Sequence, residues 1–97
     1  MSAYLIVDTH VRERDSPERK RYAEEVPKTI EKYGGRYLVR AGKFEVLEGD
    51  WNPEILVILE FPSMRALKRW YNSEEYRQIL PLALKSTTRD LVAVDGL

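Results

Sequence analysis

The sequence contains no cysteine and only one histidine, His10. Without cysteine the chain can form neither a disulfide nor a thiolate metal site, and one imidazole gives little support for zinc. The chain also has no excess of positive or negative charge, because 16 Lys and Arg residues balance 16 Asp and Glu residues. A chain without basic excess lacks the electrostatic footprint expected for binding nucleic acid or an anionic membrane.

Long hydrophobic runs and cofactor motifs are absent as well. No apolar stretch approaches the roughly 20 residues that a membrane span needs. The start of the chain has no basic segment, apolar core or cleavage site typical of a signal peptide. There is no glycine-rich phosphate loop, dinucleotide fingerprint or serine nucleophile elbow. We therefore expect a soluble cytoplasmic protein with no membrane or nucleic-acid partner, no metal and no cofactor.

The composition is that of an ordinary globular domain. The chain has 97 residues, of which 43% are hydrophobic and 33% are charged. This length predicts a single domain over residues 1–97. Such a domain buries only roughly 60–65% of the surface of its unfolded chain, so self-association would be one way to cover the rest.

One stretch organises the whole pattern. Five consecutive aliphatic residues, 55–59, lie between Pro53 and Pro62. The run is too short for a buried helix, and it predicts a strand that is apolar on both faces. Such a strand lies in the middle of a sheet that is covered on both sides. Glu60 is the one carboxylate inside this pattern.

Other segments complete the pattern. Serine N-caps predict helices that begin at Ser16, Ser63 and Ser73. Pro27 predicts a kink near Ala23–Val26, and Pro81 predicts a break or restart. Further strands are predicted over residues 3–11, 36–40 and 91–95. Residues 41–43 interrupt the second of these as a bulge or a small hairpin, and extended structure resumes over 44–48.

The predicted order is β-α-β-β-α-β, which is typical of a ferredoxin-like α+β fold. Right-handed crossovers place both helical segments on one face of a four-stranded antiparallel sheet. The other face would then carry an apolar surface that cannot remain in water, and a second subunit is the simplest cover. Its members are Tyr4, Ile6, Leu38, Leu56, Ile58 and Val92 or Val94.

Four motifs suggest a family. They are YGGRYLVR at 33–40, LEGDW at 47–51, EFPS at 60–63 and WYxSxxY at 70–76. In this order they resemble a bacterial family of unknown function within the dimeric α+β-barrel superfamily. The resemblance implies a homodimer whose two sheets pack face to face into a barrel, with a cleft between sheet and helices in each subunit. The superfamily includes cofactor-free monooxygenases, and a shared fold does not transfer such an activity.

Strand alternation predicts one polar constellation. If Glu60 faces the barrel, then Asp8, His10, Arg36 and Arg40 lie on the same side. Of these, four could meet near one end of the cavity: Asp8, His10, Arg40 and Glu60. In a functional interpretation, Arg40 and Arg36 bind a carboxylate or enolate oxygen, while Glu60, Asp8 or His10 moves a proton. In a structural interpretation, Arg40 and Glu60 form an ion pair near the dimer interface, with Asp8 as a third member.

Aromatic residues give a second group of candidates. Trp70, Tyr71 and Tyr76 could form the wall of a site for a flat substrate, or they could fill the space between helix and sheet. Packing is the better interpretation for Trp70, whereas the hydroxyl of Tyr76 could reach into a cleft. Trp51 is expected to be a loop aromatic or a dimer contact.

The sequence thus leaves two functions open. One is a small-molecule-binding homodimer, or a cofactor-free enzyme that acts by proton transfer or oxygenation on a hydrophobic, aromatic or carboxylate-bearing metabolite. The other is a non-catalytic dimerisation or ligand-sensing module in which the arginine–glutamate cluster is structural.

Overall fold

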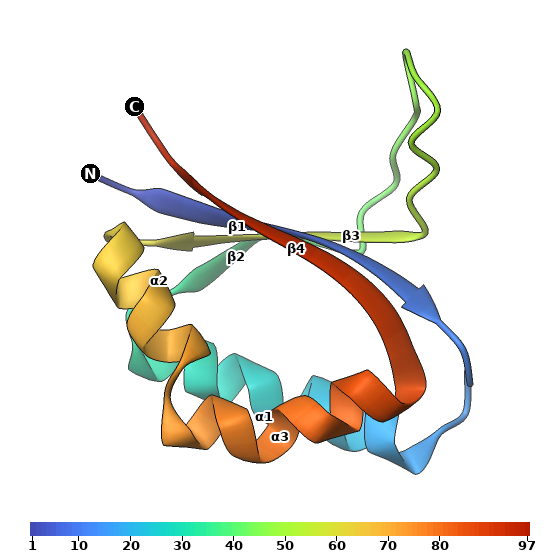
Figure 1. The fold of residues 1–97 in the computed structure, drawn as a ribbon, viewed down its shortest axis with the longest axis horizontal. Helices are drawn as coiled ribbons and strands as arrows, with labels where there is room; N and C mark the ends of the chain where they lie inside the picture. Colours follow the sequence, from blue (N-terminus) through green and yellow to red (C-terminus); the bar gives the residue numbers. More distant parts are fainter.

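The computed structural model describes residues 1–97 as a four-stranded sheet covered on one face by three helices (Figure 1). The strand order is β2-β3-β1-β4, and all neighbouring strands are antiparallel. The predicted ferredoxin-like α+β fold is therefore confirmed. The elements are β1 (Ala3–Val11), α1 (Pro17–Lys32), β2 (Arg36–Arg40), β3 (Ile55–Phe61), α2 (Met64–Tyr71), α3 (Glu74–Ser86) and β4 (Thr87–Asp95).

The helices begin where the serines predicted. The Oγ atom of each serine, Ser16, Ser63 and Ser73, accepts a hydrogen bond of 3.0–3.1 Å from the backbone N–H three residues later. The predicted break at Pro81 is wrong, because α3 runs through it without interruption. Pro81 is exposed, so water can satisfy the carbonyl that loses its N–H partner. None of the helices is both long and apolar enough to cross a membrane.

The core lies between the sheet and the helices. Alternate residues of β1 and β3 point toward it, including Leu5, Leu59 and Phe61, all at most 3% exposed. Gly35 is required where β2 begins, because a Cβ atom there would lie 2.6 Å from the ring of Phe61. The turn after α1 thus brings β2 against the core.

The opposite face of the sheet, which we call the open face, is apolar and uncovered in the single chain. Leu38, Val92 and Val94 are 46%, 59% and 44% exposed. Ile6, Leu56 and Ile58 are half-buried on the same sheet. The chain therefore carries the apolar surface that the sequence predicted.

A bulge in β2 was not predicted at its actual position. Arg36 and Tyr37 pair with Glu60 and Leu59, whereas Arg40 pairs with Val57, because the register shifts by one residue between Tyr37 and Val39. The extra residue inverts the alternation of side chains along the strand. The interruption expected at residues 41–43 is thus displaced to Leu38.

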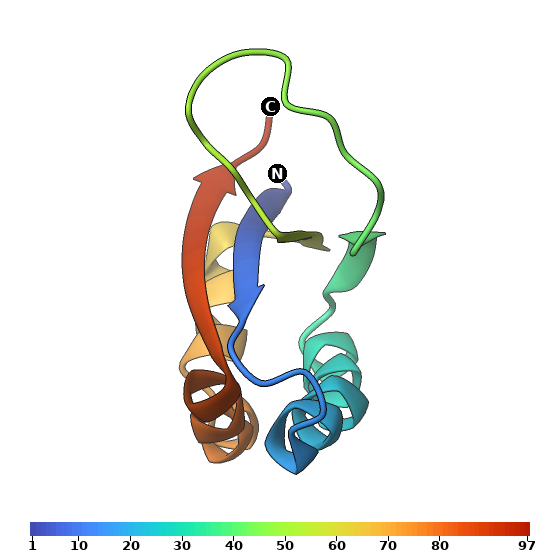
Figure 2. The same ribbon diagram turned by 90° about the vertical axis from the view of Figure 1, so that its right-hand side faces the viewer.

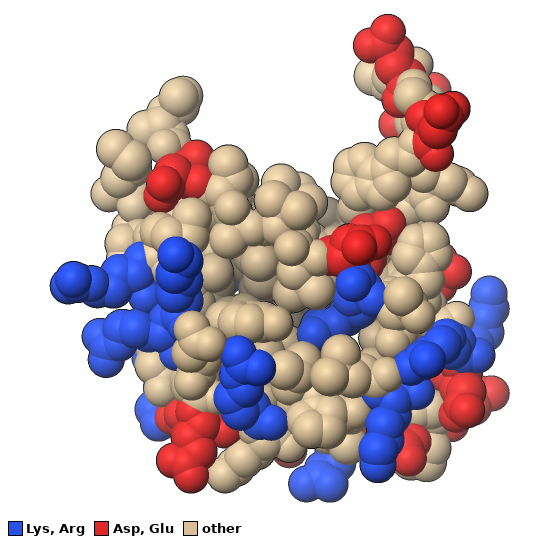
Figure 3. All heavy atoms as spheres, in the orientation of Figure 1, with Lys and Arg blue, Asp and Glu red and all other residues tan.

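Residues 41–54 form a projecting segment, which we call the arm. It leaves the sheet on the side of the open face (Figures 1 and 2). The expectation of extended structure over 44–48 is wrong, since these residues belong to no strand. Acidic side chains gather on the arm (Figure 3), which contains Glu45, Glu48, Asp50 and Glu54. Its apolar residues are exposed too, up to 84% for Leu47.

β4 begins four residues earlier than predicted. It follows α3 without a loop and pairs with β1 from Thr87 to Asp95. The early start places Arg89 in the sheet, opposite Thr9 of β1.

Candidate functional site

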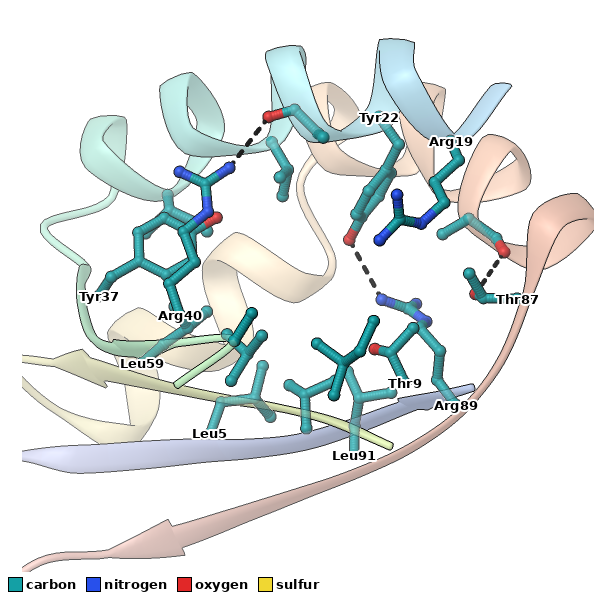
Figure 4. A pocket seen from close by; sticks show the side chains of 18 of the residues that line it. Leu5, Thr9, Arg19, Tyr22, Tyr37, Arg40, Leu59, Thr87, Arg89 and Leu91 are labelled. Atoms are coloured by element: carbon teal, nitrogen blue, oxygen red, sulfur yellow. Dashed lines mark hydrogen bonds between the residues drawn. The ribbon is translucent and has the colours of Figure 1, made fainter. Parts of the chain in front are cut away.

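A cleft of about 190 Å³ lies between α1 and the helix-facing side of the sheet (Figure 4). Fourteen of its 20 lining residues are hydrophobic, so an occupant would be surrounded mainly by hydrocarbon. The sheet contributes aliphatic residues such as Leu5, Leu59 and Leu91, and α1 contributes Tyr22, among others.

The charged residues of the cleft all have the same sign. Arg19, Arg40 and Arg89 line it, and no aspartate, glutamate or histidine does. None of the three arginines forms an ion pair within 4.0 Å. In a low-dielectric cleft, such uncompensated guanidinium groups attract anions.

Arg89 belongs to a polar cluster at one end of the cleft. Its Nη1 atom donates to the hydroxyl of Tyr22 at 3.1 Å, and Nη2 donates to that of Tyr76 at 3.2 Å. The two hydroxyls are 2.9 Å apart. The Nε atom of Arg89 is buried and has no hydrogen-bond partner.

Sequence reasoning missed Arg89 because it started the last strand at Leu91. The signal was available in the alternation of Thr87, Arg89 and Leu91, which all line the cleft. An arginine at an inward position of a strand is unusual enough to mark a site.

Burial keeps the phenol of Tyr22, beside Arg89, in its neutral form. Burial raises the pKa of Tyr22, and burial also raises the pKa of Tyr37 at the other end of the cleft. Burial tends to lower the pKa of Arg89, but Tyr22 and Tyr76 offset this and the net pKa lies above its ordinary value. The cluster therefore combines the positive charge of Arg89 with two phenol hydroxyls and contains no carboxylate.

Arg40 also belongs to the cleft, contrary to the prediction that it faces the barrel. Its Nη2 atom donates to the carbonyl of Ala23 in α1 at 3.3 Å, and its guanidinium lies 4.6 Å from the ring centre of Tyr37. The bulge in β2 turns Arg40 to this face. The predicted Arg40–Glu60 ion pair is therefore wrong.

Glu60 instead pairs with Arg36 on the open face. Nη2 of Arg36 lies 2.7 Å from a carboxylate oxygen of Glu60, and Nε also donates to it at 2.7 Å. The bond from Arg36 lowers the pKa of Glu60, with further bonds from Ser2 and Tyr4. Arg36 precedes the bulge, so the alternation that placed it on the same face as Glu60 still holds there.

Asp8 and His10 lie at the other end of the open face. Asp8 is only 4% exposed and accepts bonds from Glu54 N and Trp51 Nε1, both at 3.0 Å. Nε2 of His10 lies 3.1 Å from Asp8 Oδ2. Burial raises the pKa of Asp8, but these bonds outweigh it and the pKa is lowered. Asp8 thus fixes the base of the arm.

The four-residue constellation predicted from strand parity is not assembled. Asp8 is opposite Leu56 and Tyr4 is opposite Glu60. Four residues of strand therefore separate the Asp8 and Glu60 positions, about 13 Å at 3.3 Å per residue. The sheet itself separates both carboxylates from Arg40.

Trp70 and Tyr76 pack against each other beneath the cleft. Their ring centres are 4.3 Å apart, and Trp70 Nε1 donates to Thr29 Oγ1 at 2.9 Å. Trp70 is 2% exposed, consistent with packing, although it also lines the inner end of the cleft. Tyr76 is fully buried, and its hydroxyl belongs to the Arg89 cluster.

Solved structures share this fold. A Rhodopseudomonas palustris protein of unknown function, RPA0582, is 20% identical over 99% of this chain and 82% of its own, with a TM-score of 0.76. SnoaB of Streptomyces nogalater, a cofactor-independent oxygenase, is 7% identical over 99% and 93%, with a TM-score of 0.66. A dimeric ferredoxin-like protein of unknown function from Jannaschia sp. CCS1 is 12% identical over 99% and 100%, with a TM-score of 0.64.

Identities this low show the fold alone. No curated protein matches the sequence. The family model described as a domain of unknown function, DUF1330, matches residues 2–97. The chain therefore belongs to the DUF1330 family.

Proposed function

We propose that this protein is a homodimer that binds a small, largely apolar metabolite in the cleft between α1 and the sheet. The observation that carries this proposal is the cleft itself, with a mainly hydrophobic lining and arginines that have no carboxylate partner. A cavity with those properties is the usual form of a small-molecule site.

Two observations support the homodimer. The open face exposes Leu38, Val92 and Val94 on a contiguous sheet surface, and a monomer would leave this surface in water. The Jannaschia protein of the same fold is described as dimeric. Packing two open faces against each other would cover the apolar residues and place each arm beside the partner subunit.

The structure supports ligand binding better than it supports catalysis, because the residues predicted to transfer a proton lie outside the cleft. Asp8, His10 and Glu60 belong to the open face and do not line the cleft. Asp8 is occupied by bonds to the arm, and Glu60 by Arg36. These contacts favour the structural interpretation of the acidic residues, and with it a ligand-sensing module.

The likeness to SnoaB gives cofactor-free oxygenation as a second candidate. A substrate in the cleft would have to be activated by its own acidity, because the cleft offers neutral tyrosines and arginines but no carboxylate or imidazole base. Oxygen uptake with acidic phenols as substrates would test this activity.

The first experiment is native mass spectrometry of the protein purified without added ligand, followed by thermal shift assays against a panel of small apolar compounds. We expect a dimer and a stabilising ligand. Ala23→Phe should fill the cleft mouth and abolish the ligand shift, whereas Glu24→Phe, at an adjacent exposed position outside the lining, should retain it. A monomer would contradict the dimer, and ligand shifts that Ala23→Phe leaves unchanged would contradict the site.

A further inference from the structure

The Arg89 end of the cleft has the properties of an anion site. Its guanidinium extends from β4 into the cleft toward Tyr22, and Arg19 of α1 points into the same end (Figure 4). A guanidinium has five N–H donors in a planar fork. In Arg89, two Nη–H groups donate to tyrosine hydroxyls, and the buried Nε–H group has no acceptor in the protein.

The charge balance around Arg89 also supports an anion site. A half-buried guanidinium loses hydration, and proteins ordinarily compensate for that with a carboxylate. The partners of Arg89 are tyrosine hydroxyls rather than carboxylates, and the cleft lining contains no acidic residue. The missing negative charge is therefore one that a ligand can supply.

The rest of the cleft restricts the ligand. Thr9 lies beside Arg89 in Figure 4 and offers a hydroxyl, and beyond it the surface is formed by aliphatic residues such as Leu5, Leu59 and Leu91. A ligand that matches this gradient has one acidic end and one apolar body. A molecule charged at both ends would lose hydration over the aliphatic surface without compensation.

We propose that the cleft selects small monocarboxylic acids, and that Arg89 binds the carboxylate while the aliphatic surface holds the apolar body. This inference rests on the proposed function and names its ligand class. The Nε–H and the free Nη–H donors bind the carboxylate oxygens, and Tyr22 and Tyr76 hold the guanidinium in place.

The test compares isosteric acid and amide probes. Phenylacetate and phenylacetamide, and likewise hexanoate and hexanamide, differ in charge and little in shape. We expect the wild-type protein to bind each acid at least about tenfold more tightly than its amide in NMR titrations, the scale of one charge-assisted hydrogen bond. The variant Arg89→Gln should lose most of this preference, because only Arg19 then remains at this end of the cleft.

Controls keep the outcomes separate. Arg21→Gln makes the same change on the exposed side of α1, outside the cleft, and should retain the preference for the acid. If Arg89→Gln does not fold, Arg89→Lys keeps the charge without the fork and should lose most of the preference. Equal wild-type affinity for acid and amide would overturn the anion site and leave the cleft as a ligand site. Binding of neither probe pair would overturn both proposals.

Discussion

Asp8 combines burial with full ionisation, which is uncommon for a carboxylate. The side chain is 4% exposed, and three groups contact its carboxylate: the backbone N–H of Glu54, the indole of Trp51 and the imidazole of His10. Each of these contacts comes from the arm or from the end of β1. The residue therefore explains why a segment without regular secondary structure has a defined base.

Replacing Asp8 by alanine should loosen the arm and destabilise the fold. The backbone N–H of Glu54 and the indole N–H of Trp51 would lose their bonds to a charged acceptor, at a cost of about 1–3 kcal/mol. Urea unfolding measures the loss, and the fluorescence of Trp51 should become more solvent-like before global unfolding. Asp50→Ala, an exposed aspartate of the arm that accepts no side-chain bond, serves as the matched control. Equal stability of the two variants would contradict the anchoring role.

At the scale of elements, α1 and α3 pack side by side (Figure 2). Glu75 of α3 links them through contacts with Lys32 and Tyr33. Its carboxylate pairs with Lys32 and accepts the hydroxyl of Tyr33 at 3.0 Å. The bond from Lys32, together with a backbone N–H and Tyr33, lowers the pKa of Glu75 from 4.5 to about 2.

This pKa predicts an acid-dependent contribution to stability. A carboxyl group with a lower pKa in the folded state stabilises the fold fully above its unfolded pKa, and the contribution is lost as pH falls toward the folded value. Between about pH 4.5 and 2, the melting temperature of the wild type should therefore fall more than that of Glu75→Gln. Glu74→Gln, at the neighbouring exposed position, should follow the wild type. Parallel curves for the wild type and Glu75→Gln would contradict this role.

Strand patterns explain what the sequence could and could not predict. Alternation placed Leu5, Leu59 and Glu60 correctly because β1 and β3 pair without interruption. It misplaced Arg40 because the bulge at Leu38 adds one residue to β2, and no residue type there signals the shift. The serine caps were predictable because the N-cap bond is local. Arg89 required the exact start of β4, and strand ends depend on long-range pairing.

At the scale of the whole molecule, the proposed dimer makes a clear prediction about the open face. Val92 is 59% exposed in the single chain, so Val92→Glu should leave the fold intact. In the dimer the same carboxylate would be buried without a partner, and the dissociation constant should rise by at least about tenfold. Sedimentation velocity across a concentration series measures this effect.

Leu84→Glu provides the matched control. Leu84 is 57% exposed on α3, on the opposite side of the molecule from the open face. The same exchange there should leave assembly unchanged. If both variants sediment like the wild type, the open face is not the dimer interface.

The bulge in β2 also affects how the sheet meets strands of other molecules. β2 and β4 are the two edges, and an edge strand exposes unpaired N–H and C=O groups on which a foreign strand can add. The irregular register of the five-residue β2, flanked by Arg36 and Arg40, makes that edge a poor template. β4 keeps a regular register over nine residues. Fibrillar aggregation, when the protein is stressed, is therefore expected to start at β4.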